Sequence, residues 1–134
     1  MNKSVIACVE DLFFRSKIET TARHLNVPVR FVGAKELVRS CGEQDAAAVL
    51  LELSNGDSLA AVREIRRDKA TASIPVIGFL SHVDQKLARE AEAAGVTQVL
   101  PRSQFSENLP DLLMDLLAPG TKREVQEEPE LPDE

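Results

Sequence analysis

The stretch VLLELSNGD, residues 49–57, places one carboxylate inside an apolar run. The aliphatic residues on either side of Glu52 are typical of a strand that is buried on both faces, as in a parallel sheet. A Ser-Asn-Gly turn follows, so Glu52 stands at the end of that strand. A buried carboxylate without a partner is costly, and it is therefore normally paired, hydrogen-bonded or protonated. The stretch thus predicts a parallel sheet and raises the question of what faces Glu52.

On both sides of this stretch, short apolar runs alternate with helical patterns. The apolar runs predict strands at 4–9, 27–32, 46–53, 73–80 and 97–101. The helical patterns fall at 13–25, at 34–41, from Asp57 or Ser58 to about 68, at 83–95 and within 105–118. The last helix is expected to start near Pro110, because proline is tolerated in a first turn. Strands separated by single helices predict an α/β fold, a three-layer doubly wound sandwich around a parallel sheet.

Length and composition fit one domain of ordinary globular type. The chain has 134 residues, of which 43% are hydrophobic and 28% charged. No apolar run approaches the ~18–20 residues that span a bilayer, and the first residues match a signal peptide poorly. Cys8 and Cys41 are expected to be reduced, buried thiols. The sequence contains no CxxC pair, so we do not expect a zinc site. We therefore expect a cytoplasmic protein that has no membrane contact.

The negative charge is concentrated at the C-terminus. The chain has a net charge of −6, and residues 119–134, with six acids and two bases, carry −4 of it. We expect residues 1–118 to form the domain and 119–134 to form an acidic, disordered tail. The rest of the chain offers no basic face for nucleic acid. The basic cluster Arg63, Arg66, Arg67 and Lys69 is expected at a helix end, where cations complement the helix dipole.

Two segments carry a resemblance to a known family. IPVIGFLSH (74–82), followed by EAAGVTQVLPR (92–102), resembles the receiver domain of two-component response regulators. The resemblance extends over about residues 4–118, with weaker matches in the first and third strands. It implies a flavodoxin-like (βα)5 fold, CheY-like, with strand order 2-1-3-4-5. It also implies a role in two-component signal transduction and phosphorelay.

The resemblance implies a phosphorylation pocket in which most positions are altered. Receivers carry a phosphoacceptor aspartate after strand three, an acidic pair for Mg²⁺ after strand one, a hydroxyl after strand four, a lysine after strand five and a switch aromatic on strand five. The phosphoacceptor position is Glu52 here, and the acidic pair falls on Val9 and Glu10, or on Glu10 and Asp11 one residue later. The hydroxyl, lysine and aromatic positions are Leu80 (with Ser81 next), Arg102 and Val99.

These changes predict a degenerate receiver, or pseudo-receiver, that is not an enzyme and has no catalytic residue. Val9 supplies no oxygen to Mg²⁺, Leu80 cannot hydrogen-bond a phosphoryl group, and the longer Glu52 side chain displaces the nucleophile. No cofactor is expected, and Mg²⁺ binds at Glu10, Asp11 and Glu52 only if the pocket still functions. One hypothesis makes Glu52 a phosphomimetic residue paired with Arg102 across the crevice. In the other, Glu52 points into water at the rim of the sheet.

The leading functional hypothesis is a protein-interaction module. By resemblance, its partner is a signalling protein, either a histidine kinase or a downstream effector. The partner face is expected to comprise the last two predicted helices and the strand at 97–101, with residues such as Gln85, Arg89, Glu92, Gln98, Glu107 and Asp111. A homodimer through this face is an alternative partner. Two other functions stay open: an active, Mg²⁺-dependent receiver that uses Glu52 or Asp57, and a flavodoxin-like module for a small molecule.

Overall fold

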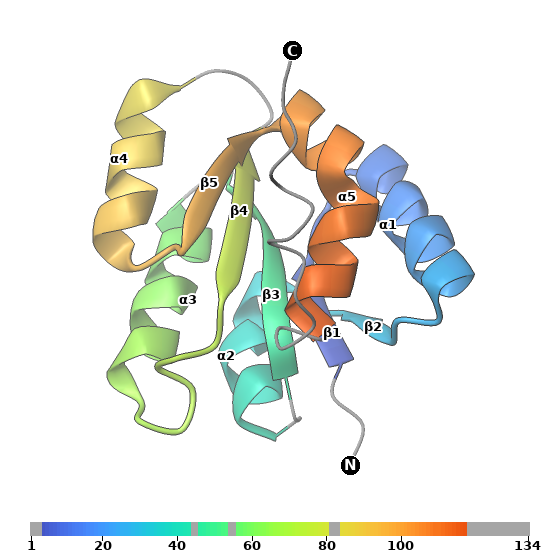
Figure 1. The fold of residues 1–134 in the computed structure, drawn as a ribbon. Coiled ribbons are helices and arrows are strands. Elements are labelled where there is room, and N and C mark those ends of the chain that lie inside the picture. Colours follow the sequence, from blue (N-terminus) through green and yellow to red (C-terminus); the bar gives the residue numbers. More distant parts are fainter. Residues whose placement is uncertain (1–3, 44–45, 54–55, 81–83, 118–134) are drawn as a thin grey trace.

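A computed structural model describes residues 4–43, 46–53, 56–80 and 84–117. Five strands alternate with five helices in this part of the chain (Figure 1). The strands are β1 (Ser4–Cys8), β2 (Val29–Phe31), β3 (Ala46–Leu53), β4 (Val76–Leu80) and β5 (Gln98–Pro101). The helices are α1 (Leu12–Leu25), α2 (Ala34–Glu43), α3 (Gly56–Arg67), α4 (Gln85–Ala94) and α5 (Arg102–Leu117). No helix in the described ranges is long and apolar enough to cross a membrane.

The strands form one parallel sheet in the order β2-β1-β3-β4-β5, which confirms the predicted fold class and strand order. The position of β2 at the edge of the sheet agrees with the proline that precedes it. The carbonyl of Pro28 accepts a hydrogen bond of 2.9 Å from the N–H of Val5. Right-handed connections place helices on both faces of the sheet, so that α1 and α5 cover one face and α2, α3 and α4 cover the other (Figure 1).

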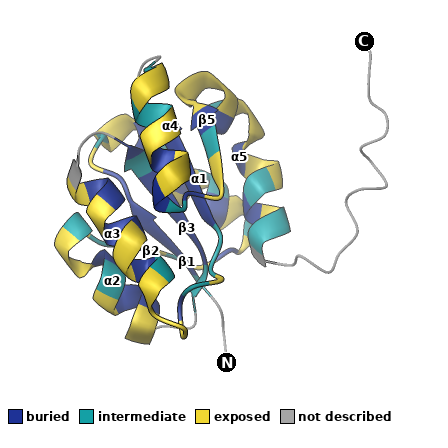
Figure 2. Ribbon diagram, turned by 90° about the vertical axis from the view of Figure 1, so that its left-hand side faces the viewer, coloured by how far each residue is buried: buried dark blue, intermediate teal, exposed yellow. Residues whose placement is uncertain are grey.

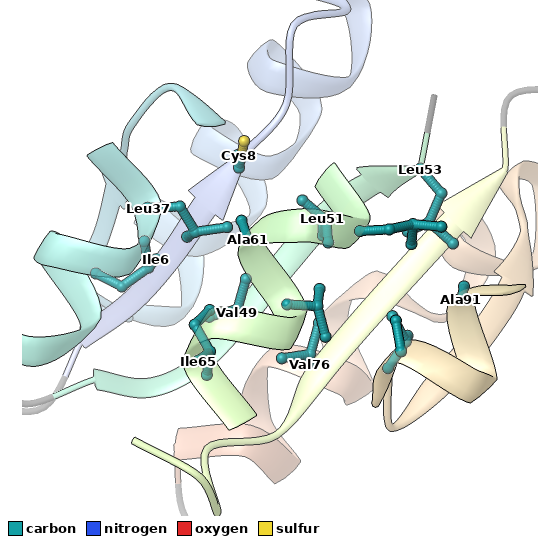
Figure 3. Close-up of a cluster of buried hydrophobic side chains, with 14 of the residues drawn as sticks. Ile6, Cys8, Leu37, Val49, Leu51, Leu53, Ala61, Ile65, Val76 and Ala91 are labelled. Atoms are coloured by element: carbon teal, nitrogen blue, oxygen red, sulfur yellow. The ribbon is translucent and has the colours of Figure 1, made fainter. Parts of the chain in front are cut away.

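Alternating side chains of the central strands fill two separate cores. Ile6, Val49 and Leu51 point to the face covered by α2, α3 and α4, where Figure 3 shows them with Leu37 and Ile65. The other core contains three packed aromatic rings, Phe14, Phe79 and Phe105. The rings of Phe79 and Phe105 stack with their centroids 4.3 Å apart. Figure 2 shows the consequence for the helices, which bury one side and expose the other.

Capping residues define where two of the helices begin and end. The side chain of Asp11 accepts a hydrogen bond from the N–H of Phe14 at the start of α1. Asn26, with φ at 58°, ends that helix in the left-handed conformation. Asp84 caps α4 in the same way as Asp11 caps α1, and Gly95, with φ at 115°, ends it. The side chains at both N-termini satisfy amide groups that would otherwise lack partners.

The start of the last helix was predicted wrongly from the sequence. α5 begins at Arg102, directly after β5, and Pro110 lies inside it rather than in its first turn. Proline removes a helical hydrogen bond and is unfavourable in a helix interior. Phe105, Leu109 and Leu113 are all completely buried on one side of α5. Burial of that apolar stripe outweighs the local cost of the proline, since full burial of such a side chain contributes about 1.5–3 kcal/mol.

Other bounds differ from the predictions by smaller amounts. β1 ends at Cys8 and β4 begins at Val76, so both strands are shorter than the apolar runs that contain them. α3 already begins at Gly56, so Asp57 lies in its first turn instead of preceding it. Differences of a few residues at element ends are expected, because apolar runs continue beyond the hydrogen-bonded ladder. The predicted tail, 119–134, lies outside the described residues.

Arg66 has a larger structural role than the helix-dipole interpretation gave it. Its guanidinium group donates hydrogen bonds to the carbonyls of Gly95, Ala72 and Ile74 at 2.9, 2.8 and 2.7 Å. A fourth bond, of 3.1 Å, reaches the hydroxyl of Thr97. Burial lowers the pKa of this guanidinium group. Arg66 therefore joins the end of α3 to the segment before β4, the end of α4 and the start of β5.

Candidate functional site

The candidate site lies at the carboxyl-terminal ends of β1 and β3, which are neighbours in the sheet. The connections to α1 and α3 start there (Figure 1). Cys8 and Leu51 are partners in the register of these strands. Glu52 therefore lies beside the residues that follow β1. In a doubly wound sheet of this order, the winding reverses between these two strands, and ligand crevices form there. The structure thus brings Glu52 next to Val9, Glu10 and Asp11, as the sequence predicted.

The carboxylate of Glu52 binds the backbone that connects β1 to α1. Its Oε1 atom accepts hydrogen bonds from the N–H of Glu10 at 2.8 Å and from the N–H of Asp11 at 3.2 Å. Both amides lie between the strand and the helix, outside either element. A hydrogen bond to an ionised acceptor is stronger than a neutral one. Glu52 therefore fastens the β1–α1 segment to the end of β3.

The backbone of Glu52 is also tied to the helix that follows. Its carbonyl accepts a 3.2 Å hydrogen bond from the hydroxyl of Ser58, in the first turn of α3. Ser58 is buried, with 4% of its surface exposed. Through its side chain and backbone, Glu52 thus contacts both the β1–α1 segment and the first turn of α3. The two hypotheses from the sequence, pairing with Arg102 and pointing into water, did not include these backbone partners.

The partners that the structure gives to Glu52 are the amides of Glu10 and Asp11, and not the predicted Arg102. None of the ion pairs between described residues joins Glu52 to Arg102. Arg102 is the first residue of α5 and not the end of a strand, so its side chain leaves from a helix. Its guanidinium carbon lies 5.3 Å from the ring centroid of Phe14, in a cation–π contact. The partners of Glu52 are backbone amides, which no residue-type pattern reveals.

The residues after β1 have three different environments. Val9 is 2% exposed and belongs to the aromatic core, so it is an apolar packing residue. Glu10 is exposed, and Asp11 is half-buried. The Oδ1 atom of Asp11 already serves as the cap of α1. In the register that assigns the acidic pair to Val9 and Glu10, one of the two positions is therefore a buried apolar side chain.

The positions that carry a hydroxyl and an aromatic residue in receivers are occupied here by Leu80 and Val99, which pack against the core. Leu80, the last residue of β4, is 8% exposed and belongs to the core under α4. Val99 is half-buried and packs against the same core. Ser81, the alternative hydroxyl, lies outside the described residues. Asp57, the alternative acid, is exposed in the first turn of α3.

The described side chains near Glu52 do not gather into a cluster of metal ligands. Mg²⁺ requires near-octahedral oxygen ligands. Within the ranges that the structure describes, no group of three or more Asp, Glu, His or Cys side chains is placed to hold a metal ion. Of the three candidates, Asp11 caps α1, Glu52 binds two backbone amides and Glu10 is exposed.

Cys8 lies beside the site but has the properties of a buried thiol. Burial, together with the negative charges of Glu10 and Glu52, raises the pKa of Cys8 to about 11. The thiolate is the reactive form of cysteine, and it is scarce when the pKa is this far above neutrality. Cys8 therefore contributes packing rather than nucleophilic chemistry.

A groove that the sequence did not predict lies away from this site, between α4, β5 and the start of α5. Its volume is about 380 Å³, and Leu80, Ala88, Val99 and Pro101 supply apolar lining. Small-molecule crevices in such sheets are expected at the reversal point between β1 and β3, which this groove does not occupy. Its lining includes residues that the sequence analysis had singled out for other reasons: Gln85 and Glu92 for the partner face, and Leu80, Val99 and Arg102 for receiver positions.

Comparison with known proteins gives a match by structure alone. No family model and no curated protein sequence matches the chain. A response regulator from Hahella chejuensis is similar, with a TM-score of 0.78 and 14% identity, over 91% of this chain and 100% of that one. The receiver domain of a sensor histidine kinase from Pseudomonas aeruginosa has a TM-score of 0.75 and 21% identity, over 88% and 99% of the two chains. That domain holds a magnesium ion in its active-site cleft.

A third similar structure is the phosphorylated form of a cyanobacterial phytochrome response regulator. Its TM-score is 0.73 at 16% identity, over 90% of this chain and 98% of that one. At such low identities, the agreement concerns the course of the backbone. The chain has the fold of CheY-like response-regulator receiver domains, so the predicted resemblance is confirmed at the level of the fold.

Proposed function

We propose that this chain is a receiver-like protein-interaction module of two-component signalling that works without phosphorylation. The observation that carries the proposal is the pair of hydrogen bonds from the Glu10 and Asp11 amides to Glu52. In this proposal, the carboxylate at the phosphoacceptor position holds the β1–α1 segment in one conformation. The domain then needs neither a metal ion nor a phosphodonor to reach its binding-competent state.

The other altered positions support the same proposal. Phosphoryl transfer depends on positioning and on neutralising the charge of the transferred group. Leu80 and Val9 are buried apolar residues, so neither can contribute to that neutralisation. A phosphorylation switch also needs an element with two stable arrangements. Leu80 and Val99, which take the positions of the switch residues, pack against the core under α4.

The proposed output is binding of another signalling protein, a histidine kinase or a downstream effector, in the cytoplasm. The proposed surface comprises α4, β5 and α5. The six residues predicted for it are all exposed: Gln85, Arg89, Glu92, Gln98, Glu107 and Asp111. A homodimer through this face is the alternative, and sedimentation equilibrium of the purified chain distinguishes the two. No enzymatic activity is assigned to the domain.

Mass spectrometry after incubation with a small phosphodonor and Mg²⁺ tests the proposal. Acetyl phosphate is a suitable donor, and the intact mass of the chain is expected to stay unchanged. Addition of one phosphoryl group that is lost in Glu52→Gln would overturn the proposal in favour of an active receiver. Addition that survives in Glu52→Gln but is lost in Asp57→Asn would equally overturn it and identify a displaced acceptor.

A further inference from the structure

The groove beside α4 is an apolar space that the core does not fill. Leu80 and Pro101 are neighbours in the register of β4 and β5, and they line it from the sheet. Val99 lies two residues before Pro101 and therefore points to the same face of the sheet. A volume of about 380 Å³ is large enough for one bulky side chain with part of its backbone. The groove therefore has the dimensions of a pocket for an anchoring residue.

Small side chains keep this groove open. Ala88 forms part of its α4 wall, one turn after Gln85 and one turn before Glu92. Ala88 and Val99 pack against the core on one side and are still half-exposed. Half-exposed apolar atoms beside a cavity gain free energy when another apolar group covers them, by about 25 cal/mol per Å². The groove is therefore suited to an aliphatic or aromatic side chain.

The charges around the groove are mainly acidic. Asp84 and Glu92 lie on its α4 side, and the exposed cation Arg89 borders it on the same helix. Arg102 also lines it, but its guanidinium group lies over the ring of Phe14, which belongs to the core on the opposite face of the sheet. Ser103 lines the groove at the start of α5, and Glu107, one turn further on, continues the same side of that helix. A cationic partner complements this rim.

The same charges disfavour two other occupants. Residues 119–134 of this chain carry a net charge of −4, so they would meet the acidic rim with charge of the same sign. In a symmetric pair, the same patch of both copies meets at the interface, so the excess of acids over bases in one copy would face the same excess in the other. Juxtaposed like charges are unfavourable at an interface. Charge complementarity therefore favours a different protein.

We propose that this groove binds one bulky apolar side chain of a partner segment whose flanking residues are lysine or arginine. The inference rests on the proposed function, because the groove belongs to the surface proposed there for output. In this arrangement the apolar side chain enters between Ala88 and Val99. The flanking cations lie against Glu92 on α4 and Glu107 on α5. The partner is thus a cationic amphipathic segment.

Titration of the full chain with two synthetic peptides tests this inference, with amide NMR as the readout. One peptide is an amphipathic helix of leucine and lysine, and its twin has glutamate in place of each lysine. The leucine–lysine peptide is expected to shift amides of α4 and β5 in a saturable manner. The twin is expected to leave them unchanged. Raising the salt concentration is expected to weaken binding of the first peptide, because the rim charges are exposed to solvent.

Matched variants locate the binding site. Ala88→Leu fills the groove and is expected to lower the affinity by about tenfold or more, the loss typical when an anchor loses its pocket. Ala60→Leu adds the same side chain at an exposed position of α3 and is expected to change nothing. Glu92→Lys is expected to lower the affinity by about threefold to tenfold. Glu19→Lys, the same reversal on α1, is the control for general charge.

The inference would be overturned by equal binding of both peptides, by shifts confined to other elements, by unchanged affinity of Ala88→Leu, or by self-association of the chain through α4 and β5. Saturation of the groove by leucine amide with the same affinity as the lysine peptide would also overturn it, by indicating a small apolar ligand. Peptide binding that appears only after beryllofluoride is added would support the groove and overturn the proposed function. If the chain binds neither peptide and also gains no phosphoryl group from acetyl phosphate, this inference is overturned and the proposed function is not.

Discussion

At the scale of single residues, Glu52 has a structural task that its position in the sequence only partly revealed. A carboxylate at the end of a buried strand predicted a partner, and the structure supplies two backbone amides. The arginine predicted as its partner, Arg102, is the first residue of α5, and its guanidinium group lies over the ring of Phe14. Residue types show which side chains are charged, but they do not show where main-chain donors lack an acceptor.

Glu52→Ala is expected to lower the free energy of unfolding by about 1–3 kcal/mol, because it leaves the Glu10 and Asp11 amides without their acceptor. Glu52→Gln keeps an oxygen of similar reach and is expected to cost less, about 0.5–1.5 kcal/mol. Urea denaturation of the three proteins measures both values. An alanine variant as stable as the original would contradict the role given to this carboxylate.

A second prediction at this scale concerns Gly78, where the packing leaves no space for a side chain. A Cβ atom at this position of β4 would lie 2.8 Å from Cδ1 of Leu53, which is too close for ordinary packing. Gly78→Ala is therefore expected to destabilise the protein by about 1–3 kcal/mol. Gly42 lies in α2, and a Cβ there would meet nothing within 4 Å. Gly42→Ala is expected to be neutral or stabilising. Thermal denaturation of the two variants beside the original protein measures both effects.

At the scale of elements, one side chain connects parts of the chain that are distant in sequence. Arg66 at the end of α3 binds the carbonyl of Gly95 after α4 and the hydroxyl of Thr97 before β5. The same hydroxyl accepts a hydrogen bond of 2.9 Å from the N–H of Val76. The arrangement fixes the C-terminal end of α4, and therefore one end of the wall of the groove. A basic cluster in the sequence could not distinguish this connection from a favourable helix dipole.

Arg66→Ala is expected to lower the free energy of unfolding by about 1–3 kcal/mol, because three partly buried carbonyls and one exposed hydroxyl lose a charged donor together. Amide hydrogen exchange is expected to speed up at the end of α4 and in β5. Arg63, on the same helix, is exposed, and Arg63→Ala is expected to change stability by no more than about 0.5 kcal/mol. Equal effects of the two substitutions would contradict the account of Arg66.

At the scale of the whole molecule, the fold was predictable because its signals are repetitive. Five apolar runs and five helical patterns gave the parallel sheet, and the resemblance gave its strand order. The extent of α5 was not predictable from its proline, because burial of Phe105 and Leu109 decides it. The positions of Val9, Glu10 and Glu52 at the candidate site were predictable from strand ends. The groove was not, because it depends on how α4 lies against β5.

The two thiols provide a readout of global unfolding. Burial raises the pKa of both Cys8 and Cys41 from 9.0 to about 11, and nearby carboxylates contribute at Cys8. At pH 8 we expect thiol reagents to modify the chain only as fast as it unfolds. A raised pKa stabilises the folded state most below pH 9, and this stabilisation is lost as the pH rises toward 11. Rapid modification of the folded protein would contradict the buried placement of both thiols.

The most direct test of the central claim is an amide NMR titration with Mg²⁺, followed by beryllofluoride, which mimics a phosphoryl group on an acidic residue. If the carboxylate of Glu52 holds the β1–α1 segment without a metal, the amide signals of Glu10 and Asp11 will stay in place through both additions. Saturable shifts at these amides that extend to α4 would contradict the account. They would identify the domain as a metal-dependent receiver that still switches.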